Sequence, residues 1–219
     1  MSAPQLDPDE LSLSERAYRV IRDQLVTLEI RPGTAINDEQ LAGVLGCGRT
    51  PVREALKRLE TERLVVAFPR RGTFATEVNI TDLRHISEVR QQLEPTAAAA
   101  AAERATGPQR EQLRSLLGVL ERHGKAPATS DELMRLDMQV HRAIYAATRN
   151  PYLEDTLIHY DNLATRIWCL FADRLPDLAG HVGEHGPLLR AVVDGEQQAA
   201  ERLAREHVAH FEQAIRAVI

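Results

Sequence analysis

The chain has 219 residues and a formal net charge of −5 at pH 7. It contains no run of eighteen apolar residues, and its acidic, proline-containing start MSAPQLDPDE is unlike a signal peptide. We therefore expect no membrane-spanning segment and a cytoplasmic protein. The two cysteines, Cys47 and Cys169, form no CxxC pair, which argues against a disulfide or a zinc knuckle.

Residues 37 to 61 predict a helix, a glycine turn and a second helix. Asn37 is a suitable N-cap for the first helix, and Gly46 is suited to end it. Pro51 falls in the first turn of the second helix, where its missing N–H removes no intrahelical bond. The second helix has one apolar stripe, made by Val52, Ala55, Leu56 and Leu59.

The remaining faces of the second helix, and the hairpin after it, are basic. Residues 49 to 71 hold seven Lys or Arg (49, 53, 57, 58, 63, 70, 71) against three Glu (54, 60, 62), a local charge of +4. Strands are expected at 64–68 and 73–78, around a turn with arginines at its tip. This order predicts a winged helix-turn-helix that binds double-stranded DNA. The alternative is a solvated helix face whose cations pair with the three glutamates.

The segment GRTPVREALKRLETERLVVAFPRRGTFA closely resembles the DNA-binding region of GntR-family bacterial transcription regulators. The resemblance implies that Arg49 and Arg53 contact the operator, that Thr50 touches a phosphate or base edge, and that Gly72 lets the wing approach the minor groove. The segment departs from the family pattern at two positions. Gly48 replaces the usual Ser or Thr cap, and Glu39 stands where some members place a DNA-contacting Arg. We therefore assign no base contact to the first helix.

From Ile80 onward, periodic apolar stripes predict about six helices and no strands. The fold class expected is mainly α, with an N-terminal winged helix-turn-helix and a C-terminal all-α bundle. Pro95 is expected to kink its helix or end its first segment, and the run Ala97 to Ala102 to allow close packing. We expect a flexible N-terminus at 1–10 and domains at 11–78 and 79–219. The expected helices span 81–105, 108–123, 130–148, 151–174, 178–194 and 196–217.

The segment LDMQVHRAI carries a second signal. Asp137 and His141 lie at i and i+4, so a carboxylate and an imidazole share a helix face, a spacing suited to one divalent ion. An ion-paired Asp and His would have the same spacing, and a metal needs a third ligand. His185 is in phase with an apolar stripe and is expected inward, whereas His181 has no such stripe. The spacing prefers His207 without excluding His210, and His159 is a weaker candidate.

DMQVHRAIYAATRNPYL and EHGPLLRAVVDGEQQAAERLAREHV resemble the FCD ligand-binding domain of the FadR-type GntR subfamily. That resemblance implies a bound divalent metal, zinc first and nickel or manganese next. EVRQQLE resembles the segment whose Arg faces the pocket, so Arg90 is implied to hold an effector carboxylate. The metal ligands implied by position are Asp137, His141, His185 and His207.

These signals predict a homodimeric, metal-containing regulator that binds a pseudo-palindromic operator and responds to a small organic acid. We expect no enzyme, because the chain has neither HExxH spacing nor a nucleophile elbow. Two alternatives remain open. A metal-dependent hydrolase would use the same open coordination positions to activate water. A purely structural metal would tie the helices together whether or not an effector binds.

Overall fold

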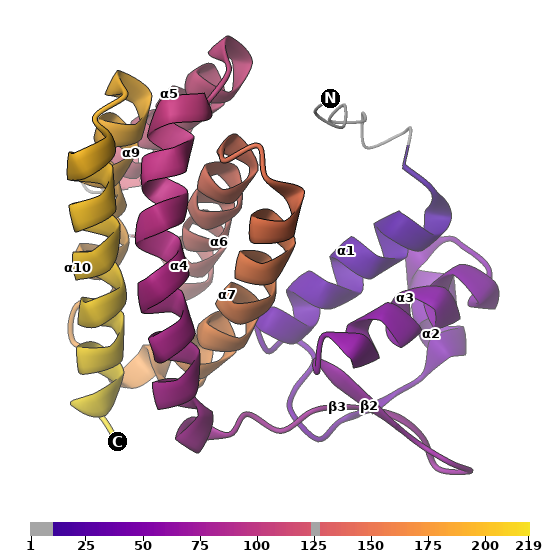
Figure 1. The fold of residues 1–219 in the computed structure, drawn as a ribbon. Helices are drawn as coiled ribbons and strands as arrows, with labels where there is room; N and C mark the ends of the chain where they lie inside the picture. Colours follow the sequence, from indigo (N-terminus) through magenta and orange to yellow (C-terminus); the bar gives the residue numbers. More distant parts are fainter. Residues whose placement is uncertain (1–10, 124–127) are drawn as a thin grey trace. The chain divides into compact units, whose positions relative to one another are not determined.

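A computed structural model describes residues 11–123 and 128–219, so the predicted flexible N-terminus, 1–10, lies outside the described residues. The chain packs as two compact units, Met1–Val78 and Asn79–Ile219. The first holds a small sheet and the second is helical (Figure 1). The predicted fold class is confirmed.

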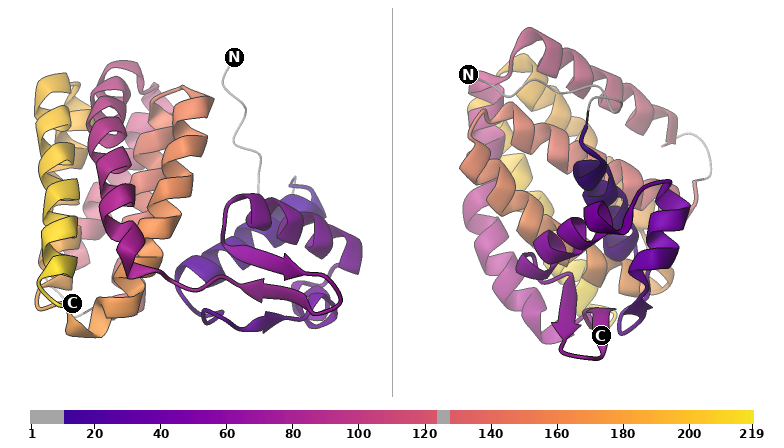
Figure 2. Two further views of the ribbon diagram at one scale, coloured as in Figure 1. Left: turned by 60° about the horizontal axis from the view of Figure 1, so that its bottom comes forward. Right: turned by 90° about the vertical axis from the view of Figure 1, so that its right-hand side faces the viewer.

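The first unit combines three helices with a three-stranded antiparallel sheet. The helices are α1 (Leu13–Val26), α2 (Asp38–Leu45) and α3 (Arg49–Thr61), and the strands are β1 (Ala35–Ile36), β2 (Val65–Phe68) and β3 (Gly72–Ala75). The strand order is β1-β3-β2, and β2 and β3 form the hairpin of the wing (Figure 2). Helix α1 packs on α3, and the shared core includes the fully buried Ile21, Leu25, Val52, Leu59 and Leu64.

The helix boundaries of this unit follow from local chemistry. The Asn37 side chain accepts hydrogen bonds from the backbone N–H groups of Glu39 and Gln40, which confirms the predicted N-cap. Gly46 ends α2 with φ of 63°, a left-handed conformation that favours glycine. The expected second strand, 73–78, is too long, because β3 ends at Ala75. Strand β1 was not predicted, since two residues are too few to show an alternating pattern.

The second unit is a helical bundle in which α4 packs along α10 and also contacts α6, α7 and α9. Within its described residues it contains no strand. Two short 3-10 helices, η2 (Ile80–Asp82) and η3 (Ala172–Arg174), precede α4 and follow α7. The helices are α4 (Leu83–Arg104), α5 (Gly107–His123), α6 (Ser130–Ala147), α7 (Pro151–Phe171), α8 (Leu178–Gly183), α9 (His185–Asp194) and α10 (Gln197–Arg216).

Small side chains bring α4 and α10 together. Ala97, Ala98 and Ala101 of α4 are at most 1% exposed, and Ala200 and Ala204 of α10 are at most 2% exposed. The packing predicted for the alanine run is therefore confirmed. Because small residues let two helix backbones approach closely, α10 can carry a functional side chain into the bundle interior.

One helix prediction needs correction, and the alternative that Pro95 ends the first segment of its helix is excluded. The expected single helix at 178–194 is wrong, because α8 ends at Gly183 and α9 begins at His185. Pro187 has no N–H for the Gly183 carbonyl, and its ring would clash there in a continuous helix. Pro95, by contrast, does not end α4, which runs through it. Here the packing of α4 on its neighbours outweighs one lost backbone hydrogen bond.

None of the helices in the described ranges is both long enough and apolar enough to cross a membrane.

Candidate functional site

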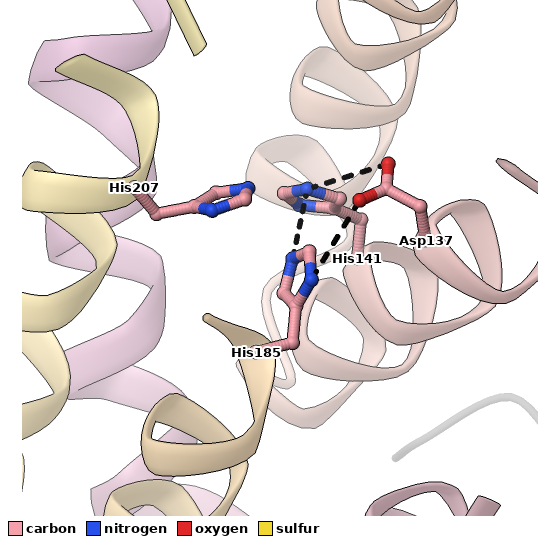
Figure 3. A group of neighbouring side chains, drawn as sticks. All are labelled: Asp137, His141, His185 and His207. Atoms are coloured by element: carbon pink, nitrogen blue, oxygen red, sulfur yellow. Dashed lines mark hydrogen bonds and ion pairs between the residues drawn. The ribbon is translucent and has the colours of Figure 1, made fainter. Parts of the chain in front are cut away.

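The four predicted metal ligands meet in the interior of the second unit (Figure 3). Asp137 and His141 lie one turn apart on α6, His185 begins α9, and His207 lies in the middle of α10. One ligand atom from each lies within 4.8 Å of the others. We call these four residues the buried cluster, because their exposed fractions run from 0% for His185 to 9% for Asp137.

The contacts inside the buried cluster are close. His141 Nε2 lies 3.2 Å from His185 Nε2. Asp137 approaches both imidazoles, with Oδ2 at 3.9 Å from His141 Nε2 and Oδ1 at 3.6 Å from His185 Nδ1. The His207 ring centroid lies 4.2 Å from that of His185, and Figure 3 shows the ring pointing toward His141.

The surroundings determine which nitrogens carry hydrogens. His185 Nδ1 lies 3.1 Å from the Val182 carbonyl oxygen, which can only accept, so Nδ1–H donates and Nε2 keeps its lone pair. His141 Nδ1 lies 3.0 Å from the Tyr145 hydroxyl, which itself hydrogen-bonds the Glu94 side chain. If Tyr145 donates to the Glu94 carboxylate, it accepts from His141 Nδ1–H, and His141 Nε2 also keeps its lone pair.

This arrangement fits a divalent cation. Two lone pairs that face each other at 3.2 Å repel, and a cation between them turns that repulsion into two coordinate bonds. In addition, Asp137 Oδ1 is buried and finds no hydrogen-bond partner among the described residues. A buried carboxylate oxygen without a partner is costly unless it is paired or coordinates a metal.

The protonation states agree with such a site. Burial lowers the pKa of His185 to about 4 and holds the pKa values of His141 and His207 well below the usual histidine range. These imidazoles are therefore neutral near pH 7, the form that coordinates metals. Burial, and then the nearby Asp161 carboxylate, raise the pKa of Asp137 well above its usual value. A bound cation would favour the ionised form of Asp137, and so would offset the effects of burial and of Asp161 on its pKa.

Arg90 lies on the wall of a cavity beside the buried cluster. The cavity, about 10 Å³, has room for about one water molecule. Arg90 is 3% exposed and already pairs with two carboxylates, Glu94 and Asp161, the latter at 3.5 Å. An incoming carboxylate would have to compete with them. The lining consists of Arg90, Asp137, His141, Asp161, Thr165, Trp168, His181, His207 and Phe211.

The expectation that His181 does not point inward is wrong. Its side chain is only 9% exposed, and its ring lies 4.3 Å from that of His207 and 4.4 Å from that of Trp168. Because α8 is separate from α9, the helical phase of His181 must be measured against α8 alone. There, Leu178 lies three residues before it and is buried, a signal that the expectation of one long helix hid.

Four other polar residues around the cluster were missed. Glu94 has a signal in the sequence, since it lies four residues after Arg90 on the same helix face. Tyr145 likewise lies four residues after His141. Asp161 and Glu184 reach the site from α7 and from the junction of α8 and α9, and no spacing in the sequence indicates either.

The residues expected to contact DNA lie at the start of α3 and on the wing. The side chains of Arg49 and Arg53 are 49% and 64% exposed, and both meet one carboxylate of α2. Arg49 Nη2 lies 3.0 Å from Asp38 Oδ1, and Arg53 Nε lies 2.6 Å from Asp38 Oδ2. The alternative pairing with glutamates of the same segment therefore does not describe these two arginines. Thr50 is exposed beside them.

Gly72 begins β3 with φ of 96°, a conformation that L side chains rarely adopt. Among the described residues, no atom outside Gly72 and its two chain neighbours lies within 4 Å of the place where its Cβ would be, so the backbone is open to close approach. Arg71, at the tip of the hairpin, is exposed and extends over the Phe68 ring.

Comparison with known proteins gives two family matches that together cover most of the chain. Residues 13–75 match bacterial regulatory proteins of the gntR family, and residues 85–210, more than half of the chain, match the FCD domain. The chain is 34% identical over 132 residues to the Nta operon transcriptional regulator of Aminobacter aminovorans, covering 60% of this chain and 62% of that protein.

A second relative aligns over nearly the whole length. It is the HTH-type transcriptional repressor RspR of Escherichia coli K12, 24% identical over 214 residues, which cover 98% of this chain and 93% of that protein. Among solved structures, E. coli McbR/YncC superposes with a TM-score of 0.81 at 22% identity, covering 94% of this chain and 98% of that one. At this identity the structural match supports the fold alone.

Proposed function

This chain belongs to the GntR family of bacterial transcription regulators and carries an FCD domain, and from that premise we propose how it is controlled. We propose that a divalent metal in the buried cluster, together with a small organic acid, sets the affinity of a homodimer for its operator. A transcription regulator acts on the chromosome, so the proposed location is the cytoplasm.

The observation that carries the metal proposal is the 3.2 Å distance between His141 Nε2 and His185 Nε2, together with the unpartnered Asp137 Oδ1 beside them. The proposed ligands come from three helices, and imidazole-rich sets favour zinc, with nickel or manganese next. The ion supplies electrostatic attraction for anionic oxygens when bound. The proposed ligands are Asp137, His141, His185 and His207.

The chain's own groups position the effector. Arg90 is the cation on the cavity wall, and a guanidinium can hold a carboxylate through two parallel hydrogen bonds. Because the cavity has room for about one water molecule, and Glu94 and Asp161 already pair with Arg90, the proposed acid must widen the cavity and replace one of these pairings. Arg90 and Glu94 both belong to α4, the first long helix after the DNA-binding unit. A change in their pairing therefore acts on the helix through which the chain enters the bundle.

In the DNA-binding unit, we propose that Arg49 and Arg53 exchange Asp38 for the operator. Thr50 contacts a phosphate or a base edge, and Gly72 brings the wing backbone close to the minor groove. Because one winged helix reads a short half-site, a homodimer on a pseudo-palindromic operator is the expected assembly.

The two alternatives fare differently. The families matched and the relatives are transcription regulators, not enzymes, so the hydrolase alternative is set aside. A purely structural metal keeps one supporting observation, because the proposed ligands join α6, α9 and α10. The two uses of the metal differ in whether an acid changes DNA binding.

The test measures DNA affinity with the metal and the acid varied separately. An operator duplex is selected from a random-sequence pool with zinc-loaded protein, and a panel of small mono-, di- and hydroxycarboxylates is added. We expect one class of acid to change the dissociation constant, and the effect to vanish after chelation. A metal-dependent melting temperature with no effect of any acid on DNA affinity would favour the purely structural metal.

A further inference from the structure

We propose a second, outer cation site, formed by His181, Glu184 and the Nδ1 side of His207, through which a divalent ion reaches the buried cluster. The inference rests on the proposed metal in that cluster. We call these three residues the outer cluster. One ligand atom from each lies within 4.8 Å of the others.

An ion needs a route to the buried cluster, because the ligands there have little contact with solvent. The side chains of His141 and His207 are 3% exposed, that of His185 is 0% exposed, and that of Asp137 is 12% exposed. A hydrated cation must lose most of its water before it reaches them. Ligands that lie between the solvent and the cluster can replace that water in steps.

The outer cluster lies between the solvent and the buried cluster. Glu184, at the junction of α8 and α9, has a side chain that is 32% exposed, and it contacts three imidazoles. Its Oε2 lies 3.0 Å from His207 Nδ1 and 3.5 Å from His181 Nδ1. Its Oε1 lies 2.7 Å from Nδ1 of His210, a side chain that is 53% exposed. Polar groups therefore run without a break from solvent to His207.

The composition of the outer cluster suits a loading site. One carboxylate and two imidazoles are ordinary ligands for zinc or nickel, and three ligands leave positions for the water that an arriving ion still carries. His210 orients Glu184 by holding Oε1, which leaves Oε2 as the oxygen nearest His181 and His207.

His207 belongs to both sites, and its geometry connects them. With Nδ1 beside Glu184, its other ring nitrogen is left for the buried cluster. A neutral imidazole carries a lone pair on only one of its two ring nitrogens and a proton on the other, so His207 binds one ion at a time, and its proton must change nitrogens when an ion passes from Nδ1 to the buried side. The two sites are therefore occupied one after the other, and the outer cluster is a transient binding site for an ion that enters or leaves the buried cluster.

A simpler role for Glu184 would be to orient His207 through its Nδ1–H, as carboxylates commonly do for metal-bound histidines. The two roles differ in kinetics. Loss of an orienting group weakens binding and speeds release. Loss of a transient binding site on the path slows both metal binding and metal release. It leaves the equilibrium constant unchanged, because the ion follows the same path in both directions.

The experiment uses the full chain and follows Trp168, the sole tryptophan, whose ring lies 4.4 Å from that of His181. Rapid mixing of metal-free protein with Co²⁺ gives the loading rate from fluorescence quenching, and excess chelator gives the release rate. His181→Phe keeps the aromatic stack with Trp168 and His207 but removes the ligand nitrogen. Glu184→Gln keeps the size of the side chain but removes its charge, and His85→Ala, an exposed residue of α4, is the matched control.

We expect His181→Phe and Glu184→Gln each to slow loading and release by about tenfold, with their ratio changed less than about threefold. His85→Ala should match the wild type. Unchanged loading with faster release would overturn the proposal and leave Glu184 as an orienting group, and unchanged rates would overturn it outright. If His181→Phe proves unfolded by circular dichroism, Glu184→Gln decides. Failure of the wild-type protein to bind Co²⁺ any better than His141→Ala would defeat the proposed metal itself.

Discussion

Nitrogen lone pairs are the feature of the buried cluster on which the account depends at the scale of single residues. His141 and His185 face each other through Nε2 atoms 3.2 Å apart, while their Nδ1 atoms are held by Tyr145 and Val182. Repulsion between these two nitrogens lowers the stability of the metal-free protein, and a cation that binds both of them removes that repulsion. Metal binding and the stability of the second unit should therefore be strongly coupled.

The buried histidines predict how the stability of the metal-free protein depends on pH. Their folded-state pKa values lie below the unfolded value of about 6.5, so their contribution is present above that pH and is lost as the pH falls toward the folded values, about 4 for His185. The contribution of Asp137 to this pH dependence has the opposite sign, because a raised folded-state pKa increases stability as the pH falls. It is the contribution of one group, however, against those of three histidines.

We therefore expect the free energy of unfolding of the chelator-treated protein to fall from pH 7 to pH 4.5, by up to about 1.4 kcal/mol per pH unit for each histidine. Urea titrations at several pH values measure this slope. The variant His185→Ala should have a shallower slope than the wild type. A wild-type stability independent of pH across this range would show that the histidines are not held neutral by burial.

A substitution of Arg90 should weaken effector binding without removing the metal. Arg90→Ala would leave Glu94 and Asp161 buried without their cation, a loss of about 3 to 5 kcal/mol, so it tests stability more than recognition. Arg90→Lys keeps the charge but loses the planar fork that pairs with a carboxylate. We expect Arg90→Lys to retain the metal and to bind the effector about tenfold more weakly or worse. Calorimetry checks the second result, and an unchanged effector affinity would remove Arg90 from the site.

At the scale of elements, α3 carries the proposed DNA contacts, and α2 holds them in place. Arg49→Ala or Arg53→Ala should cost about 1 to 3 kcal/mol on the selected operator if each arginine reads a base. Each variant also frees Asp38 from one of its two cations, which affects binding to any DNA alike. If the arginine reads a base, the loss should therefore be larger on the operator than on random DNA. Fluorescence anisotropy at several salt concentrations measures both. Equal losses on the two DNAs would assign the arginine to phosphate contacts.

The helices with regular apolar stripes could be predicted from the sequence, and the interactions that cross between elements could not. The buried stripe of α3 and the Asn37 cap depend on neighbours within four residues, so the sequence alone indicates them. The break between α8 and α9 has a local cause, Pro187, but the regular stripe around it favoured one long helix. That error also misplaced His181.

The candidate site shows the same division. Asp137 and His141 are indicated by their spacing on one helix, and His185 by its phase, whereas family resemblance was needed to choose His207 over His210. In the structure His210 is 53% exposed and holds Glu184, while His207 is 3% exposed and lies in the buried cluster. Asp161, Glu184 and Asp38 act on residues far away in the sequence or across a turn, and no periodicity indicates such pairings.

At the scale of the whole molecule, the proposed function requires two DNA-binding units on one operator. A homodimer is therefore expected at micromolar concentration, free and on DNA. Light scattering coupled to size-exclusion chromatography gives the mass directly. A strictly monomeric protein in both conditions would contradict the proposed assembly.

The central claim is that one divalent ion joins α6, α9 and α10 through the buried cluster. The most direct test is elemental analysis of the purified wild-type protein beside His185→Ala, His207→Ala and the control His210→Ala, with a melting curve for each. The account predicts about one divalent ion per chain in the wild type and in His210→Ala. It predicts little metal and a lower melting temperature in the other two variants, because each loses a ligand that no neighbour replaces. Full metal content in both His185→Ala and His207→Ala, or its loss only in His210→Ala, would contradict the account.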